Sequence, residues 1–468
     1  MSEAENIFGV GVGRHVKEEA VARLEEFVLK KISGAKLPSI AIAVVEGGRV
    51  AYLRAFGFRD IERMLQATPS TVYGIGSVTK SFTALAVMQL VERGLLSLDD
   101  PVDKYLPVKL RPFGEPVTVE HLLSHTSGIP ALGYAEAFIT GAVEGGDVWM
   151  PLAKPEDVIV FMSGAQEWAV ARPGERFFYL NEGYVLLGLL ISKLSGVRYE
   201  DYVKERILKP LGMERSYFSR EEAEADPELA TPYLLEEGHP RPSRFPYGIT
   251  SDGGLLSNVL DLSKYLSLYL GRGEVGGVRL VARSVIEEME RPRASVPWQV
   301  LGGECYGLGW VITPDFYGRK LVHHSGSVLV YTAFVGYVPS SGVGVAVLAN
   351  ASGYPLSRIG MYALALALGE DPRKLPFIGL EEVYEKVVGV YEAYNGTVRV
   401  KVEVEGDVLY LEFVSRGLRR RIPLFPESIT EEAALFYTVL GGVRINAGFK
   451  LRDRVELIYE RYKFIKRA

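Results

Sequence analysis

The sequence is poor in cysteine, in side-chain amides and in long apolar runs. Its single cysteine, Cys305, excludes an internal disulfide. No run of 18 apolar residues occurs, the length that a membrane-spanning helix needs, so we expect no membrane partner. Acidic residues outnumber basic ones, 58 to 53, which excludes the basic excess typical of nucleic-acid-binding proteins. We therefore expect no nucleic-acid partner either.

The start of the chain has no pattern of an export signal. Residues 1–6 are acidic and polar, whereas a secretory signal begins with positive charge and continues with an apolar stretch. Cytoplasmic residence is therefore the expectation. The few amides, four Gln and six Asn in 468 residues, together with many Glu, Lys and Arg, are typical of proteins from hyperthermophiles.

Ser77 and Lys80 form the most informative motif. They stand three residues apart at the start of an apolar stretch with helical spacing, which ends at Gly94. Positions i and i+3 are neighbours on a helix, so Lys80 is predicted to reach the Ser77 hydroxyl. A serine hydroxyl becomes a good nucleophile only when a base takes its proton. Ser-x-x-Lys is also frequent by chance, and a serine N-cap with an exposed lysine is the alternative.

Tyr179 and Asn181 offer two further polar groups. They stand two residues apart just before a predicted helix over 182–195, so they project from a turn in a shared direction. Such groups would bind and orient a substrate beside a nucleophile. The structural alternative is an asparagine that caps the helix next to a packed aromatic residue.

His324-Ser325-Gly326-Ser327 stands at the end of a predicted strand over 319–324. Small residues beside a strand let a substrate backbone approach closely. The N–H of Ser327 is a candidate for one half of an oxyanion hole, with the N–H of Ser77 as the other half. A structural hydrogen bond at a strand end is the alternative for His324.

His121 and His125 have the i, i+4 spacing of half a metal site. The glutamate of a His-Glu-x-x-His motif is missing, and other candidate ligands are scattered along the chain. We therefore expect a hydrogen-bonded turn at residues 124–128, no metal and no other cofactor.

The order of predicted elements indicates an α+β fold followed by a small β-domain. A helix over 15–32 and strands over 40–45 and 50–58 open the chain, and a mostly helical section covers about 95–300. Strands return at 306–313, 319–324, 329–338 and 343–349, before a helix over 355–368. An antiparallel sheet built from both ends of a domain explains this order. After a polar segment at 369–376, alternation of apolar and polar residues predicts strands at 398–404 and 409–413. Further short strands are predicted at 419–424, 435–440, 443–450 and 455–461, and such a series is typical of a small antiparallel barrel or sandwich.

Taken together, these motifs resemble one family. Ser77-x-x-Lys80, Tyr179-x-Asn181 and His324-x-Gly326 occur in the order typical of serine β-lactamase-like hydrolases, the group of class C β-lactamases, D-alanyl-D-alanine carboxypeptidases, D-aminopeptidases and related esterases. Supporting stretches are Leu122-Leu123-Ser124-His125-Thr126-Ser127-Gly128, Pro173-Gly174-Glu175, Pro210-Leu211-Gly212-Met213, Gly253-Gly254-Leu255 and Tyr306-Gly307-Leu308-Gly309-Trp310.

The resemblance implies a domain organisation. A β-lactamase-like catalytic domain would cover 1–368, with an all-helical insert at about 95–300, and a linker would cover 369–376. A lipocalin-like barrel would then cover 377–468. This arrangement resembles archaeal self-compartmentalising serine peptidases of the group, so we expect a homo-oligomer that assembles through the barrel.

The resemblance also implies roles for the site residues. Ser77 would form an acyl-enzyme, and either Lys80 or Tyr179 would be its base. Asn181 would bind substrate and orient Lys80, with Gly326 and Ser327 beside the oxyanion. His324 stands where class C β-lactamases carry lysine.

A histidine suits a β-lactam carboxylate less well than a lysine does, because a histidine is charged only near or below pH 6.5. We therefore expect a peptidase acting on short or D-amino-acid-containing peptides, with a carboxylesterase as the alternative. A non-catalytic protein that keeps the fold and binds a ligand or partner is the alternative of another class.

Overall fold

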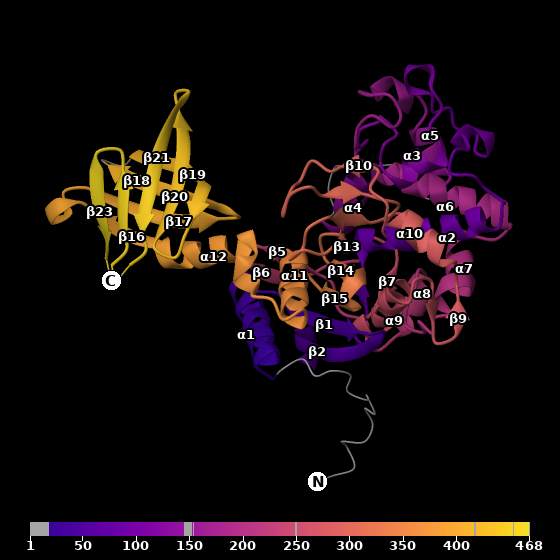
Figure 1. The fold of residues 1–468 in the computed structure, drawn as a ribbon, viewed down its shortest axis with the longest axis horizontal. Coiled ribbons are helices and arrows are strands. Elements are labelled where there is room, and N and C mark those ends of the chain that lie inside the picture. The colour runs from indigo at the N-terminus through magenta and orange to yellow at the C-terminus, as the bar shows by residue number, and fades with distance from the viewer. Residues whose placement is uncertain are drawn as a thin grey trace, which may run out of the picture. The chain divides into compact units, whose positions relative to one another are not determined.

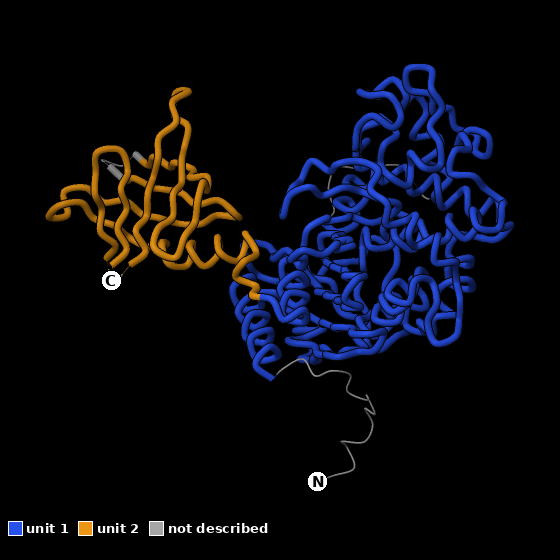
Figure 2. Tube along the Cα trace, in the orientation of Figure 1, with its two compact units in different colours: residues 1–370 blue, residues 371–468 orange. Residues whose placement is uncertain are grey.

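The computed structural model describes residues 18–144, 152, 154–248, 250–415, 418–452 and 454–467. The chain divides into two compact units, residues 1–370 and 371–468 (Figure 2). The α+β class and the small antiparallel barrel predicted from the sequence are both confirmed. None of the helices in these described ranges is long and apolar enough to span a bilayer.

A nine-stranded antiparallel sheet forms the centre of the first unit, in the order β10-β11-β12-β13-β14-β15-β1-β2-β3. Its strands are β1 (Ser39–Glu46), β2 (Arg49–Asp60), β3 (Leu65–Gln66), β10 (Ala294–Ser295), β11 (Cys305–Tyr306), β12 (Val311–Thr313), β13 (Leu321–Ser327), β14 (Thr332–Val338) and β15 (Val343–Ala349). Strand β1 pairs with β15 along its whole length, Ile40 opposite Ala349. The sheet therefore joins the two ends of the unit, as predicted.

Helices cover both faces of this sheet (Figure 1). On one face, α9 (Val259–Leu270) packs so closely that a Cβ on Gly344 would lie 3.2 Å from Leu266. On the other face, Phe334 lies against Gly360 of α11 (Leu356–Ala367). The helix α1 (Glu18–Ala35) covers α11, and the rings of Phe27 and Tyr362 stack at 4.0 Å.

The segment between β3 and β10 holds most of the remaining helices. These are α2 (Thr79–Glu92), α3 (Val119–Leu123), α4 (Tyr134–Val143), α5 (Asp157–Phe161), α6 (Asn181–Ser195), α7 (Tyr199–Val203), α8 (Arg220–Ala225) and α10 (Arg283–Met289). It also carries short ladders that the sequence analysis does not predict: β4 (Tyr73–Gly74) with β7 (Leu256–Ser257), β5 (Tyr233–Glu236) with β6 (His239–Pro242), and β8 (Glu274–Val275) with β9 (Val278–Arg279). Strands of two to four residues are too short to show a period of two.

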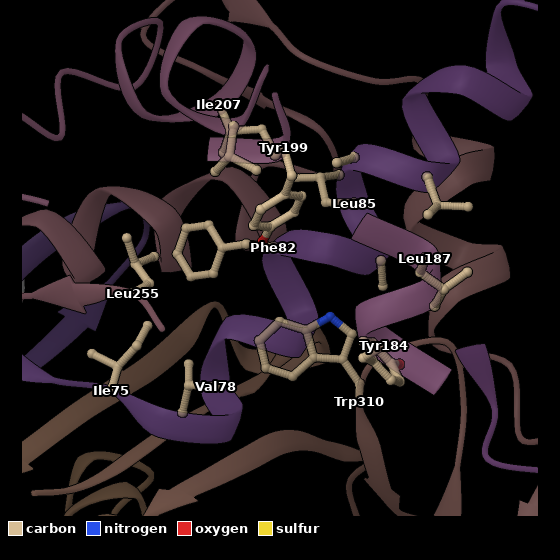
Figure 3. Close-up of a cluster of buried hydrophobic side chains, with 14 of the residues drawn as sticks. Ile75, Val78, Phe82, Leu85, Tyr184, Leu187, Tyr199, Ile207, Leu255 and Trp310 are labelled. Atoms are coloured by element: carbon tan, nitrogen blue, oxygen red, sulfur yellow. The ribbon is translucent and has the colours of Figure 1, made fainter. Parts of the chain in front are cut away.

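Helix α2 lies in the middle of the main hydrophobic core. Every residue from 79 to 90 is buried, so this helix has no polar face. Phe82 and Leu85 belong to the cluster of buried core side chains shown in Figure 3, whose members come from several elements. The labelled partners are Ile75, Val78, Tyr184, Leu187, Tyr199, Ile207, Leu255 and Trp310. Packing from all sides fixes the turn that precedes α2.

The second unit is a closed antiparallel barrel preceded by α12 (Pro376–Val387). Its strands are β16 (Gly389–Glu392), β17 (Arg399–Glu405), β18 (Val408–Ser415), β19 (Leu418–Ile429), β20 (Ala433–Leu440), β21 (Val443–Lys450), β22 (Glu456–Tyr459) and β23 (Tyr462–Lys466). Alternate side chains such as Val400, Val402 and Leu411 fill the interior. Helix α12 and strand β16 are not among the elements predicted from the sequence. The single strand predicted over 455–461 is instead a hairpin of β22 and β23 that turns at Glu460, whose φ is 50°.

Two glycines let β13 lie directly against the turn before α2. A Cβ on Gly326 would lie 1.9 Å from the Ile75 carbonyl oxygen and 3.1 Å from the Ser77 nitrogen. Gly76, with a φ of +52°, lies on the other side of this contact and faces β13, since a Cβ there would lie 2.7 Å from the Ser327 nitrogen. Only glycines permit this approach of backbone to backbone.

This contact predicts that Gly326→Ala destabilises the first unit. The added methyl group would force the end of β13 away from the turn, and overpacking of this kind costs about 1–3 kcal/mol. The free energy of unfolding from urea titration measures the loss. Gly34→Ala in α1 is the matched control, because a Cβ there meets nothing within 4 Å and alanine favours a helix. Equal stability of the two variants would contradict the prediction.

Candidate active site

Ser77 and Lys80 meet as the sequence predicts. Ser77 lies in a short 3-10 turn, Gly76–Val78, that leads into α2. The Lys80 Nζ donates hydrogen bonds to Ser77 Oγ at 3.1 Å and to the Asp252 carbonyl oxygen at 2.6 Å. Lys80 is 0% exposed, so these acceptors replace the water that its ammonium group would bind on a surface.

Asp252 is a site residue for which the sequence analysis has no role. It holds Lys80 through its main-chain oxygen, an acceptor that every residue type carries, so only its place before Gly253-Gly254 could have drawn attention to it. Its side chain is 2% exposed, and Oδ1 has no hydrogen-bond partner among the described residues. Burial raises the pKa of the Asp252 carboxyl to about 6, although the nearby Lys80 charge lowers it.

Tyr179 and Asn181 lie beside this pair. Tyr179 is in the loop before α6, and its ring centroid lies 4.9 Å from Lys80 Nζ. Asn181 is the first residue of α6. Both side chains line the cavity that Ser77 also lines. The sequence led us to expect that Asn181 orients Lys80. In the structure, the second acceptor of the Lys80 ammonium group, after Ser77 Oγ, is the Asp252 carbonyl oxygen.

His324 lies on the face of β13 that looks toward the Ser77 turn. Side chains alternate along a strand, so His324 and Gly326 share this face, whereas His323 faces Phe334 on the other. The prediction that His324 ends its strand is wrong, because β13 continues to Ser327 and His324 stands inside it.

Both ring nitrogens of His324 have hydrogen-bond partners, and the low pKa of the ring makes it neutral at neutral pH. Nδ1 lies 2.7 Å from the Ser325 carbonyl oxygen, which can only accept, so Nδ1 carries the proton. Nε2 then accepts from the Tyr306 hydroxyl at 2.9 Å. Burial, helped by the Lys80 charge, lowers the pKa of His324 to about 3.

The backbone N–H of Ser327 points away from the neighbouring strand. The Val328 N–H donates to the Tyr331 oxygen at 3.0 Å and closes the β13–β14 hairpin. Paired and unpaired positions alternate in antiparallel ladders, so the next pair, Ser327 and Thr332, directs its N–H groups outward. On that side lies the turn of Gly76 and Ser77.

Ser77, Tyr179, Asn181 and the end of β13 line a cavity of about 750 Å³. Aromatic side chains of Tyr179, Trp298 and Tyr306 and aliphatic ones such as Ile139, Leu329 and Met361 make most of its wall. Among the described lining residues, the only charged side chains are Glu136 and Asp252, and no lysine or arginine is present. His323, also in the lining, has a pKa lowered by burial to about 4.

His121 and His125 serve separate contacts. His121 caps α3 by accepting the Thr118 N–H at Nδ1. The predicted hydrogen-bonded turn is present, since the Thr126 N–H donates to the His121 oxygen at 2.8 Å. In the part of the chain that the structure describes, no three His, Cys, Asp or Glu side chains are grouped to hold a metal.

Comparison with known families gives two matches. The family model described as "Beta-lactamase" matches residues 21–370. The model described as "Pab87 octamerisation domain" matches residues 372–465.

Curated relatives match large parts of the chain. "Protein flp" of Staphylococcus aureus (strain MW2) is 28% identical over 319 residues, which is 67% of this chain and 60% of that protein. The chain thus spans less than two thirds of the length of this relative. "Penicillin-binding protein 4*" of Bacillus subtilis (strain 168) is 27% identical over 420 residues, 83% of this chain and 86% of that protein.

One solved structure extends the match to nearly the whole chain. The octameric penicillin-binding protein homologue from Pyrococcus abyssi is 55% identical, with a TM-score of 0.92 over 95% of this chain and 100% of that one. The D-amino acid amidase from Ochrobactrum anthropi SV3 is 20% identical, with a TM-score of 0.61 over 75% of this chain and 99% of that one, a likeness of fold alone.

The buried His323 predicts a specific dependence of stability on pH. The native state takes up its proton near a pKa of about 4 and the unfolded chain near 6.5, so the unfolded state binds more protons in between. The stability that neutral His323 provides is complete above pH 6.5 and is lost as the pH falls toward 4. As the pH falls through this range, the free energy of unfolding of the wild type should decrease relative to that of His323→Gln by up to about 1.4 kcal/mol per pH unit.

Urea unfolding of both proteins at pH 7, 5.5 and 4.5 measures this difference. The matched control is His239→Gln, since His239 is exposed and its ring is hydrated in both states. If the difference in unfolding free energy between the wild type and His323→Gln is the same at all three pH values, the prediction is wrong.

Proposed function

The chain belongs to the β-lactamase family, and from this premise we propose that it is a serine hydrolase that forms an acyl-enzyme on Ser77 and cleaves short or D-amino-acid-containing peptides. The observation that carries the proposal is the 3.1 Å contact between Ser77 Oγ and Lys80 Nζ at an apolar cavity. A nucleophile in direct contact with a base is the recurring arrangement of covalent catalysis.

In the proposed reaction, Ser77 Oγ attacks the substrate carbonyl carbon. Its proton passes to Lys80, which is the base in this proposal because it is the group bonded to Ser77, after the Lys80 ammonium group has first given up a proton. The N–H groups of Ser77 and Ser327 bind the oxyanion, and one such donor contributes about 3 kcal/mol in other hydrolases. As the C–N bond breaks, Tyr179, beside Lys80, donates its hydroxyl proton to the leaving nitrogen and takes in exchange the proton that Lys80 received. Water then hydrolyses the acyl-enzyme by the same groups.

The charges around the cavity favour peptides, amides or esters over β-lactams. A substrate carboxylate needs a cation opposite it. Lys80 is fully buried and bonded to Ser77 and to the Asp252 oxygen, and the described lining offers no other cation, because His324 is neutral with a pKa of about 3. Glu136 and Asp252 are acidic groups in the same lining and repel a carboxylate at neutral pH. The aromatic and aliphatic wall suits an apolar side chain on the acyl group.

A panel of chromogenic substrates tests the proposal. We expect the p-nitroanilides of D- and L-phenylalanine and short D-peptide amides to be cleaved at least tenfold faster, in kcat/KM, than nitrocefin or a D-alanyl-D-alanine peptide. A fluorophosphonate should label Ser77, and Ser77→Ala should lose the label and about 10⁴-fold or more in rate.

The other outcomes separate the alternatives. Rapid cleavage of p-nitrophenyl esters with no cleavage of any amide would favour the carboxylesterase. Ser77→Ala equal to wild type, with no covalent adduct, would show a non-catalytic protein and overturn the proposal.

We further propose that the chain forms a homo-oligomer through its barrel unit. Residues 372–465 match an octamerisation domain, and the similar Pyrococcus abyssi protein is octameric. The barrel also exposes large apolar side chains, which often mark contact surfaces. Examples are Val390, Val404, Phe425, Val439, Val443 and Ile458.

Removal of the barrel unit should therefore abolish assembly. A chain that ends at Glu370 should elute as a monomer, whereas the full chain should have the mass of an oligomer, by light scattering after size exclusion. The far-ultraviolet circular dichroism of the shorter chain checks that it is folded. A folded shorter chain with the full number of subunits would contradict the proposal.

A further inference from the structure

The structure assigns to His125 the role of a positioning residue that fixes Tyr179 beside Lys80. This inference rests on the proposed function, in which Tyr179 carries a proton. Tyr179 lies in a loop, where no ladder of hydrogen bonds holds its backbone. Its place must therefore be set by contacts from another part of the chain.

His125 supplies those contacts on both sides of Tyr179. Its main-chain oxygen accepts the Phe178 N–H at 2.8 Å. Its Nδ1 accepts the Leu180 N–H at 3.0 Å. Between these two bonds, its ring stacks on the Tyr179 ring, with centroids 4.2 Å apart and planes 30° apart. One residue thus binds the backbone before and after Tyr179 and also the face of its ring.

His125 is itself held firmly. Its φ of 58° is left-handed, a strained conformation for a residue with a side chain, which persists only where the surroundings impose it. The residue is 1% exposed, and Tyr184 and Tyr306 pack against its ring at 5.0 Å and 4.8 Å.

The hydrogen bond from Leu180 also fixes the charge of the ring. An N–H donor needs the lone pair of Nδ1, so the proton of the neutral ring is on Nε2. Burial lowers the pKa of His125 well below its usual value, and the charge of Lys80 adds to this effect. His125 therefore supports Tyr179 without a second positive charge beside Lys80.

His125 also touches the opposite wall of the site. Tyr306, which packs against its ring, donates its hydroxyl to His324 Nε2. The spacing between Tyr179 and His324 across the cavity thus depends on one buried imidazole ring.

Two substitutions test the inference. His125→Gly accepts the left-handed backbone but removes the acceptor and the ring. His125→Asn also tolerates that backbone and offers Oδ1 as an acceptor for the Leu180 N–H, so it restores one of the two lost side-chain contacts. We expect kcat on the best p-nitroanilide or ester to fall at least 30-fold in the glycine variant with KM within threefold, and to recover at least fivefold in the asparagine variant.

The matched control is His121→Asn, four residues earlier on the same turn, which should stay within threefold of wild type. Thermal unfolding confirms that each protein is folded. A merely structural residue would give equal losses in the glycine and asparagine variants, or losses that follow the melting temperature, and either result overturns the inference. A folded His125→Gly variant with the kcat of the wild type would also overturn the inference.

Fluorophosphonate labelling keeps this result separate from the proposed function. If the wild type is not labelled at Ser77, the proposed function fails. If the wild type is labelled and His125→Gly is labelled at the same rate, only the role of His125 fails.

Discussion

A lysine ammonium group without access to water is the constraint on which this site depends. Lys80 is buried within a helix that has no solvent-facing side, and an unpaired charge there would cost several kcal/mol. Ser77 Oγ and the Asp252 oxygen are its acceptors. The turn before α2, the loop of Asp252 and the end of β13 must therefore keep their places together, and the close contact of Gly76 with β13 meets this need.

The electrostatics of the cavity follow from the same constraint. A buried positive charge disfavours other positive charges nearby, and both His125 and His324 have pKa values lowered by burial and by Lys80. Neutral histidines leave Glu136 and Asp252 as the charged groups of the described lining. A wall of this kind has little affinity for anions, which separates the proposed substrates from those that carry a carboxylate.

Much of this arrangement could be predicted from residue patterns. The strict alternation around Val400 and Val402 indicates a barrel strand, and the apolar run after Lys80 indicates a buried helix. Other features have no local signal. Asp252 acts through a main-chain oxygen, and His125 acquires its partners only when α3 packs beside the loop of Tyr179. The single strand expected over 306–313 is two short strands, because Gly309, with a φ of +76°, turns the chain between them.

The pairing of β1 with β15 affects the order of events during synthesis. Ser77 and Ser327 lie 250 residues apart in the chain, and β13 enters the sheet beside strands that are made later still. Contacts between residues that are far apart in the sequence form slowly during folding. A ribosome-bound chain that already contains Ser77 and Lys80 therefore has no β13 to complete the cavity. The proposed active site would remain incomplete until nearly all of the first unit has been translated.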